Sequence, residues 1–213
     1  GPGPGPGPGP GPGPGPGPGP GNKFSTIPEG SSDGTAQGLY NCAQPFQLVA
    51  HWRMDENTWS GASGEVFDVS GNGNNGTAQG DADTLQTDPA IAGDPGTCGY
   101  GQFDGNGDFV QVPNLSDTLN ATASLAFWIK TTQTGDNTGW RAPGVAGIEQ
   151  AGGTDDIFWG WLDASGRIGI SVANDFNTKS TVPINDGSWH HVVLTRDHQA
   201  GEYQIFIDGN LNN

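Results

Sequence analysis

The chain has 213 residues and a formal net charge of −16, from 7 Lys and Arg against 23 Asp and Glu. This charge repels the phosphates of nucleic acids and the anionic headgroups of lipids, so neither nucleic acid nor a membrane surface is an expected partner. The sequence contains no run of 18 apolar residues, and it therefore predicts no transmembrane segment.

The chain begins with ten Gly-Pro repeats followed by Gly21, and we interpret residues 1–21 as a spacer. Collagen needs glycine at every third residue, whereas the period here is two, so a triple helix is excluded. Residues 22–46 are also rich in Ser, Gly and Pro and are expected to form an irregular linker. Because the chain shows neither an initial Met nor a signal peptide, we expect it to be an internal piece of a longer protein.

From Gln47 onward, short segments with an apolar residue at every second position alternate with turns rich in Gly, Asn, Asp and Pro. A period of two predicts β-strands, and many short strands joined by polar turns favour a two-sheet sandwich or jelly roll. The predicted strands are QLVAHWRM, GDFVQV, SLAFWIK, DIFWGWL, RIGISVA, SWHHVVLTR and EYQIFID. Residues 47–213 are therefore predicted to form one all-β domain with antiparallel sheets.

Two adjacent histidines, His190 and His191, lie within the segment DGSWHHVVLTRD. Neighbouring residues of a strand point to opposite faces of the sheet, so these side chains cannot bind one metal ion together. We expect a strand that is buried on much of both faces, with the histidines bonded to their neighbours. A catalytic pair is disfavoured because no Asp or Cys stands at a supporting spacing.

Tryptophans offer a possible sugar-binding surface. Trp159 and Trp161 in IFWGWLD are two residues apart and are expected on one face of a strand, where two indoles could stack on pyranose rings. Trp140, in the loop GDNTGWRAP, would add a further wall to this site. The alternative is that one or both strand tryptophans fill the core between the sheets, which is the usual location of such aromatic pairs.

Oxygen-bearing side chains recur in the turns that follow apolar segments, and these suggest a calcium site. The expected ligands come from Asp55, Asp68, Asn72, Asp104 and Asp108. The stretch DVSGNG, which starts at Asp68, resembles the beginning of a calcium loop, but Gln79 stands where an EF-hand has its bidentate Glu. Ordinary Asx turns would give the same pattern of residues, and this alternative stays open.

The chain has two cysteines, Cys42 and Cys98. An even number of cysteines in an acidic, loop-rich chain predicts one disulfide and an oxidising compartment, with two free thiols as the alternative. A cross-link between these positions would stabilise the fold by about 4 kcal/mol in the chain-entropy description.

Several segments, in this order, resemble the laminin-G-like and concanavalin A-like jelly rolls from about Leu48 to Leu211. They are HWRMDE, EVFDVSGNGNNGTA, GQFDGNGDFVQVP, SLAFWIKT, DGSWHHVVLTRD and YQIFIDGNL. The resemblance implies two antiparallel sheets packed face to face, in a module that binds carbohydrate or protein and that in many members holds calcium. The family continues with several more strands after the IFIDG turn, so we expect the C-terminal strands to be missing and the HWRM strand to lack a neighbour.

A narrower resemblance is to modules of this family in pilus-biogenesis proteins of Gram-negative bacteria. It is carried by WRMDENTWSGASGEVFDVSGNGNNG and DPGTCGYGQFDG, and the positions of both cysteines fit it. It implies a location outside the cytoplasm, in the periplasm, on the outer surface or in the secreted fraction.

We therefore expect a non-catalytic, disulfide-linked module for adhesion or pilus assembly, with a carbohydrate or a surface protein as its partner. A structural scaffold of pilus assembly without a small ligand is the alternative. The same fold hosts glucanases, whose catalytic carboxylates lie in an E-x-D-x-x-E strand. The surroundings of Glu65, Glu149 and Glu202 do not fit this motif, so a glycoside hydrolase is disfavoured.

Overall fold

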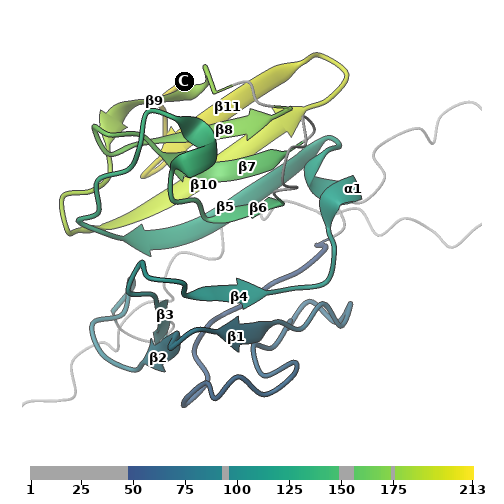
Figure 1. The fold of residues 1–213 in the computed structure, drawn as a ribbon, viewed down its shortest axis with the longest axis vertical. Coiled ribbons are helices and arrows are strands. Elements are labelled where there is room, and N and C mark those ends of the chain that lie inside the picture. Colours follow the sequence, from purple (N-terminus) through teal and green to yellow (C-terminus); the bar gives the residue numbers. More distant parts are fainter. Residues whose placement is uncertain (1–47, 93–95, 149–155, 174–175) are drawn as a thin grey trace, which may run out of the picture. The chain divides into compact units, whose positions relative to one another are not determined.

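Two four-stranded antiparallel sheets form the larger part of the computed structural model (Figure 1). The first sheet has the order β12 (Asn210–Leu211), β11 (Glu202–Ile207), β10 (Trp189–Asp197) and β5 (Ala123–Lys130). The second has the order β6 (Ala146–Ile148), β7 (Ile157–Leu162), β8 (Arg167–Val172) and β9 (Lys179–Pro183). The structure describes residues 48–92, 96–148, 156–173 and 176–213, which belong to a compact unit, Gln47–Asn213.

Two pairs of short antiparallel strands come earlier in the chain. β1 (Thr77–Gln79) pairs with β4 (Phe109–Gln111), and β2 (Asp83–Leu85) pairs with β3 (Tyr100–Gln102). The helical elements among the described residues are α1 (Ser116–Leu119) and the 3-10 turn η1 (Gly139–Arg141), and neither is long and apolar enough to cross a membrane. The antiparallel, nearly all-β architecture confirms the predicted fold class.

The predicted spacer and linker cannot be compared with the structure. Residues 1–21 and 22–46 both lie outside the described residues, as does Cys42. These predictions therefore remain predictions.

Apolar side chains of both four-stranded sheets form the main core, which explains their alternating sequences. On β10, Val192 and Leu194 are fully buried, while Val193 between them is only partly buried. The buried members of this core are Ile157, Trp159, Leu162, Ile168, Ile170, Val172, Ile184, Val192, Leu194, Ile205 and Ile207. Each fully buried aliphatic side chain of this kind stabilises the fold by about 1.5–3 kcal/mol, so this core holds the two sheets together.

A bulge in β7 breaks the period of two. Trp159 pairs with Ile170 and Trp161 pairs with Gly169, so one extra residue, Gly160, stands between the two tryptophans. Its φ of +81° lies in the region that only glycine adopts without strain. Paired residues share a face, so Trp159 faces the core with its partner Ile170. Gly169, the partner of Trp161, precedes Ile170 in β8 and lies on the opposite face, so Trp161 faces away from this core although it is buried. The prediction that both tryptophans lie on one face is wrong.

The segment QLVAHWRM forms no regular strand in its described part, contrary to prediction. Trp52 makes only an isolated bridge with Asp68. Side chains of the following loop bind the backbone instead: the amide of His51 donates to Asp68 Oδ1 at 2.9 Å, and Asn74 Nδ2 donates to the carbonyl of Val49 at 2.8 Å. Because loop side chains occupy these backbone groups, alternation of apolar residues does not lead to a strand here.

Asp163 anchors the turn between β7 and β8. Its fully buried carboxylate accepts hydrogen bonds from the amides of Ser165 and Arg167. Arg167 Nη2 lies 2.8 Å and Lys179 Nζ 3.0 Å from Oδ2, so this group also joins the turn to β9. Burial alone would raise the pKa of Asp163, but the amide and cationic donors outweigh it and lower the pKa to about 2.

We expect Asp163→Asn to lower the free energy of unfolding by about 3 kcal/mol at pH 7, because it breaks a buried ion pair. The folded pKa is below the unfolded value of about 4, so the contribution is full above pH 4 and is lost as the pH falls toward 2. Urea unfolding at pH 7 and pH 3 measures the effect, and the difference from wild type should shrink at the lower pH. Glu202→Gln, at an exposed position, is the control. Equal stabilities at pH 7 would contradict the role of Asp163.

Candidate functional site

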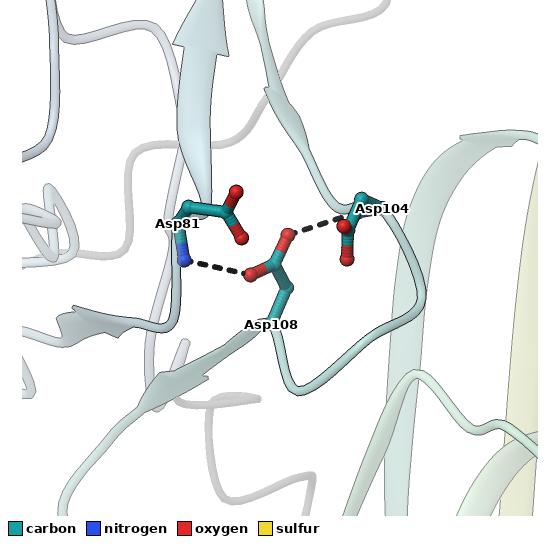
Figure 2. Close-up of side chains that lie close together, drawn as sticks. All are labelled: Asp81, Asp104 and Asp108. Carbon is teal, nitrogen blue, oxygen red and sulfur yellow. Dashed lines mark hydrogen bonds between the residues drawn. The ribbon is translucent and has the colours of Figure 1, made fainter.

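Three aspartates meet where β1 ends and β4 begins (Figure 2). Asp81 follows β1, Asp108 precedes β4, and Asp104 lies in the turn between β3 and β4. β1 and β4 are antiparallel, with Gln79 opposite Phe109, so the residues that flank this pair come close together. One carboxylate oxygen from each aspartate lies within 4.8 Å of the other two.

Backbone amides from two loops hold Asp108. Its Oδ1 accepts from the amide of Asp81 and its Oδ2 from the amide of Asp104, each at 2.9 Å. Gly80 permits this close approach, because a Cβ at that position would lie 2.4 Å from Asp108 Oδ1. The φ of Gly80 is also positive, at +74°, so the turn needs glycine for two reasons.

The three carboxylates have different proton affinities. The amide hydrogen bonds from Asp104 and Asp81 lower the pKa of Asp108. The pKa of Asp81 is raised, because its carboxyl hydrogen-bonds to Asp108 and faces the charges of Asp108 and Asp104. A hard cation with oxygen ligands would relieve this repulsion, and carboxylates that converge from two loops are ligands that suit Ca²⁺.

The structure brings together only part of the predicted calcium set. Asp104 and Asp108, two of the expected ligands, lie close together, and Asp81, which was not among the expected ligands, lies with them. Asp55 instead forms an ion pair with Arg53 at 2.7 Å. Asn72 Nδ2 donates to the carbonyl of Leu48 at 2.6 Å. The prediction that all five residues share one site is corrected.

Asp68 stabilises its own loop through hydrogen bonds to backbone amides. Its Oδ1 accepts from the amides of His51 and Ser70, and its Oδ2 accepts from the amide of Asn74, each at 2.9 Å. Burial would raise the pKa of Asp68, but these hydrogen bonds outweigh it and lower the pKa far below the usual range. The bond from the amide of Ser70, two residues further along the chain, is that of the Asx-turn alternative.

The tryptophans divide into buried and exposed ones. Trp159 is 0% and Trp161 1% exposed, so neither indole is open to a sugar ring, and the predicted stacking pair is corrected. Trp159 belongs to the core, and Trp161 packs on Phe176 with ring centroids 5.5 Å apart. Trp140 in η1 is 57% exposed, and the guanidinium carbon of Arg141 lies 5.8 Å from the centre of its ring.

A second exposed aromatic group was not predicted from the sequence. Trp128 of β5 is 39% exposed, and its ring centroid lies 5.1 Å from that of His191 on β10. Both residues face away from the core, since their neighbours Phe127 and Val192 face it. In SLAFWIK, Trp128 shares its face of the strand with Ser124, Ala126 and Lys130, which are small or polar. This alternation could have predicted that Trp128 is exposed.

Cys98 is exposed, and Arg53 Nη2 lies 3.8 Å from its Sγ. Its predicted partner, Cys42, lies outside the described residues. The disulfide therefore stays a prediction.

The two histidines of β10 point to opposite faces, as predicted. His190 has a side chain only 14% exposed, and it lies between two carboxylates. Its Nδ1 is 2.8 Å from Asp208 Oδ2, and its Nε2 is 3.2 Å from Asp186 Oδ1. Burial lowers the pKa of His190, but the two carboxylates outweigh it and raise the pKa above its usual value. His190 thus joins the turn before β10 to the turn after β11, as a structural residue bonded to its neighbours.

We expect His190→Gln to lower the melting temperature, and to do so most at acidic pH. A raised folded pKa means that the stabilisation is full below about pH 6.5 and is lost as the pH rises through the folded pKa of His190. Melting curves between pH 5 and pH 9 should show the gap between wild type and variant closing as the pH rises. His51→Gln, at an exposed position, is the control. A gap that widens with pH would refute this role.

The two stacked antiparallel sheets define the class of protein as a jelly-roll sandwich. A laminin-G-type family model, described as the concanavalin A-like lectin/glucanases superfamily, matches residues 104–213, which is just over half of the chain. The chain belongs to this superfamily. Its laminin-G-like members are generally non-catalytic binding modules, and the superfamily also includes glycoside hydrolases. Neither a curated protein nor a solved structure matches the chain.

Proposed function

We propose that this domain is a non-catalytic module that binds carbohydrate and that Trp140 forms its main contact. The observation that carries the proposal is the exposure of this indole, 57%, next to the guanidinium of Arg141. An open indole face stacks on the apolar face of a pyranose ring, and a guanidinium donates hydrogen bonds to sugar hydroxyls. Membership of a family of binding modules supports this function.

The loop that carries Trp140 is tied to β7 on both sides of the tryptophan. The amide of Asp136 donates to the carbonyl of Leu162 at 3.2 Å, and the amide of Leu162 donates to the carbonyl of Pro143 at 3.0 Å. Arg141 also pairs with Asp136 at 3.8 Å. A loop held in this way presents its aromatic side chain with little loss of conformational entropy on binding, which favours affinity.

The biological setting that we propose is the surface of a Gram-negative bacterium. The narrower resemblance of the sequence is to the laminin-G-like module of the MSHA pilus biogenesis protein MshQ, which supports a role in adhesion or pilus assembly outside the cytoplasm. Laminin-G-like domains are typically extracellular, which agrees with this location. The absence of an E-x-D-x-x-E segment in the sequence favours recognition over glycan hydrolysis.

A scaffold without a small ligand is the second candidate function. It is favoured by the outer face of the β5–β10–β11–β12 sheet, where Trp128 and Leu211 are 39% and 61% exposed. Exposed apolar side chains on a sheet face are typical of surfaces that contact other proteins. In this case the domain would dock other components of a pilus or surface assembly.

We also propose that Asp81, Asp104 and Asp108 hold a calcium ion that stabilises the domain. The support is their convergence within 4.8 Å and the exposure of Asp81 and Asp104, which leaves room for water ligands. Asp108 needs no movement to take part, because two amides already fix its carboxylate.

A glycan array tests the carbohydrate proposal. Wild-type protein should bind at least one glycan, and Trp140→Ala should weaken that binding by roughly five- to tenfold, since aromatic stacking contributes about 1 kcal/mol beyond the burial of area. Phe67→Ala is the matched control, because Phe67 is 55% exposed and lies in a different loop. Circular dichroism checks that each variant keeps its fold. A blank array for the wild type would favour the scaffold instead.

A calcium titration tests the cation proposal. The melting temperature should rise with free calcium and keep rising above saturation, because binding to the folded state adds RT ln(1 + [Ca²⁺]/Kd) to its stability. Asp81→Asn should abolish this rise and should stabilise the calcium-free protein, since it removes a repelling charge. Asp117→Asn, an exposed residue of α1, controls for net charge. A melting temperature that does not rise at millimolar calcium would contradict the proposed calcium site.

A further inference from the structure

The sequence contains the dipeptide Asn-Gly three times, at Asn72, Asn75 and Asn106. Asparagine is a chemically labile residue, and it is most labile before glycine. The amide nitrogen of the next residue attacks the side-chain amide carbon, and glycine has no Cβ to block this approach. The dipeptide is the same at all three places, so the structure around each one decides which of them reacts.

The Asn75–Gly76 pair is held at both of the groups that would react. Asn75 Oδ1 accepts from the amide of Asp68 at 2.9 Å, and the amide of Gly76 donates to the carbonyl of Val66 at 2.8 Å. Gly76 is also buried, and a Cβ at this position would lie 2.5 Å from Val110 Cγ1. The nitrogen that would attack is therefore engaged in a β-bridge and closely packed.

Asn72 is exposed, but its side chain is held by the segment before it. Its Nδ2 donates to the carbonyl of Leu48 at 2.6 Å, to the carbonyl of Val49 at 3.1 Å and to Ser70 Oγ at 3.2 Å. Its Cγ can reach the nitrogen of Gly73 only if the side chain rotates and breaks these bonds. The structure thus protects Asn72 through the group that would leave.

Asn106 has neither kind of protection. It lies in the loop that joins Asp104 to Asp108 (Figure 2), and its main-chain amide donates to Asp104 Oδ1 at 2.6 Å. Within the described part of the chain, neither its side chain nor the amide of Gly107 has a hydrogen-bond partner. Both residues are exposed, and nothing lies within 4 Å of the position that a Cβ of Gly107 would take. The two reacting groups are therefore free to meet.

We propose that Asn106 is a modification site, at which the folded domain loses its side-chain amide spontaneously and selectively. The nitrogen of Gly107 gives its proton to solvent and attacks Cγ of Asn106. The new N–Cγ bond closes a succinimide ring, the Cγ–Nδ2 bond breaks, and Nδ2 takes a proton from water and leaves as ammonia. Water then opens the ring at either carbonyl, which gives aspartate or isoaspartate. Water is the co-reactant, and no electrons are exchanged.

The product changes the group of three aspartates beside it. A new carboxylate appears in the loop that already carries Asp104 and Asp108, whose charges face Asp81. The repulsion within this group increases, and isoaspartate also lengthens the backbone between Asp104 and Asp108. The modification should therefore destabilise the calcium-free domain, and it does not depend on whether the three carboxylates hold an ion.

Peptide mapping by mass spectrometry tests the proposal on the intact, folded protein, incubated in a slightly alkaline buffer that favours the deprotonated amide. Chymotrypsin cleaves after Phe67, Phe103 and Phe109 and so separates Asn106 from the other two sites, which fragmentation distinguishes. Conversion at Asn106 should be at least about tenfold faster than at Asn72 or Asn75, because those two sites must first break hydrogen bonds.

Three controls accompany this measurement. In urea, where the protecting bonds are lost, all three sites should react at similar rates. Asn106→Gln should stop the conversion in its peptide, because the larger ring that glutamine would form closes much more slowly. With a chelator present, Asn106→Asp should melt at a lower temperature than Asn106→Gln, which keeps the loop uncharged.

Two results would overturn the proposal. One is a folded protein in which Asn72 or Asn75 reacts as fast as Asn106. The other is an Asn106 that reacts in urea but is stable in the folded protein. Equal melting temperatures of Asn106→Asp and Asn106→Gln would contradict the expected loss of stability.

Discussion

The burial of apolar side chains between the two four-stranded sheets is the interaction on which the rest of the structure depends. Trp159 occupies this core together with aliphatic residues from β8, β10 and β11. Because the sheets are fixed face to face, their outer faces and their borders are the surfaces that remain for binding. The loop with Trp140 is presented beside β7, and β5 lies at a border of its sheet.

Aspartate carboxylates hold several turns and loops of this acidic chain in place by accepting hydrogen bonds. Asp163 holds the turn between β7 and β8, Asp68 holds the loop after the first bridge, and Asp208 holds His190. In each case the carboxylate accepts hydrogen bonds from amides or cations and so stays ionised at neutral pH. Acidic composition alone is therefore poor evidence for metal binding. The group around Asp81 differs, because its carboxylates face one another and raise the pKa of one member.

The carbohydrate contact that we propose depends on one exposed side chain. Trp140 offers an open aromatic face next to a cation, which suits the alternating apolar and hydroxylated faces of a sugar.

The sequence by itself determined the fold class, most of the long strands and the opposite orientations of His190 and His191. These features follow from the period of two, which depends only on neighbouring residues along the chain. The tertiary structure alone decided that Trp161 faces outward, that QLVAHWRM is held by loop side chains, and that Asp81 joins Asp104 and Asp108. A bulge, a loop contact and a convergence of turns all depend on pairing between residues far apart in the chain. Such pairing is set by the packing of the whole domain, and no local pattern of residues records it.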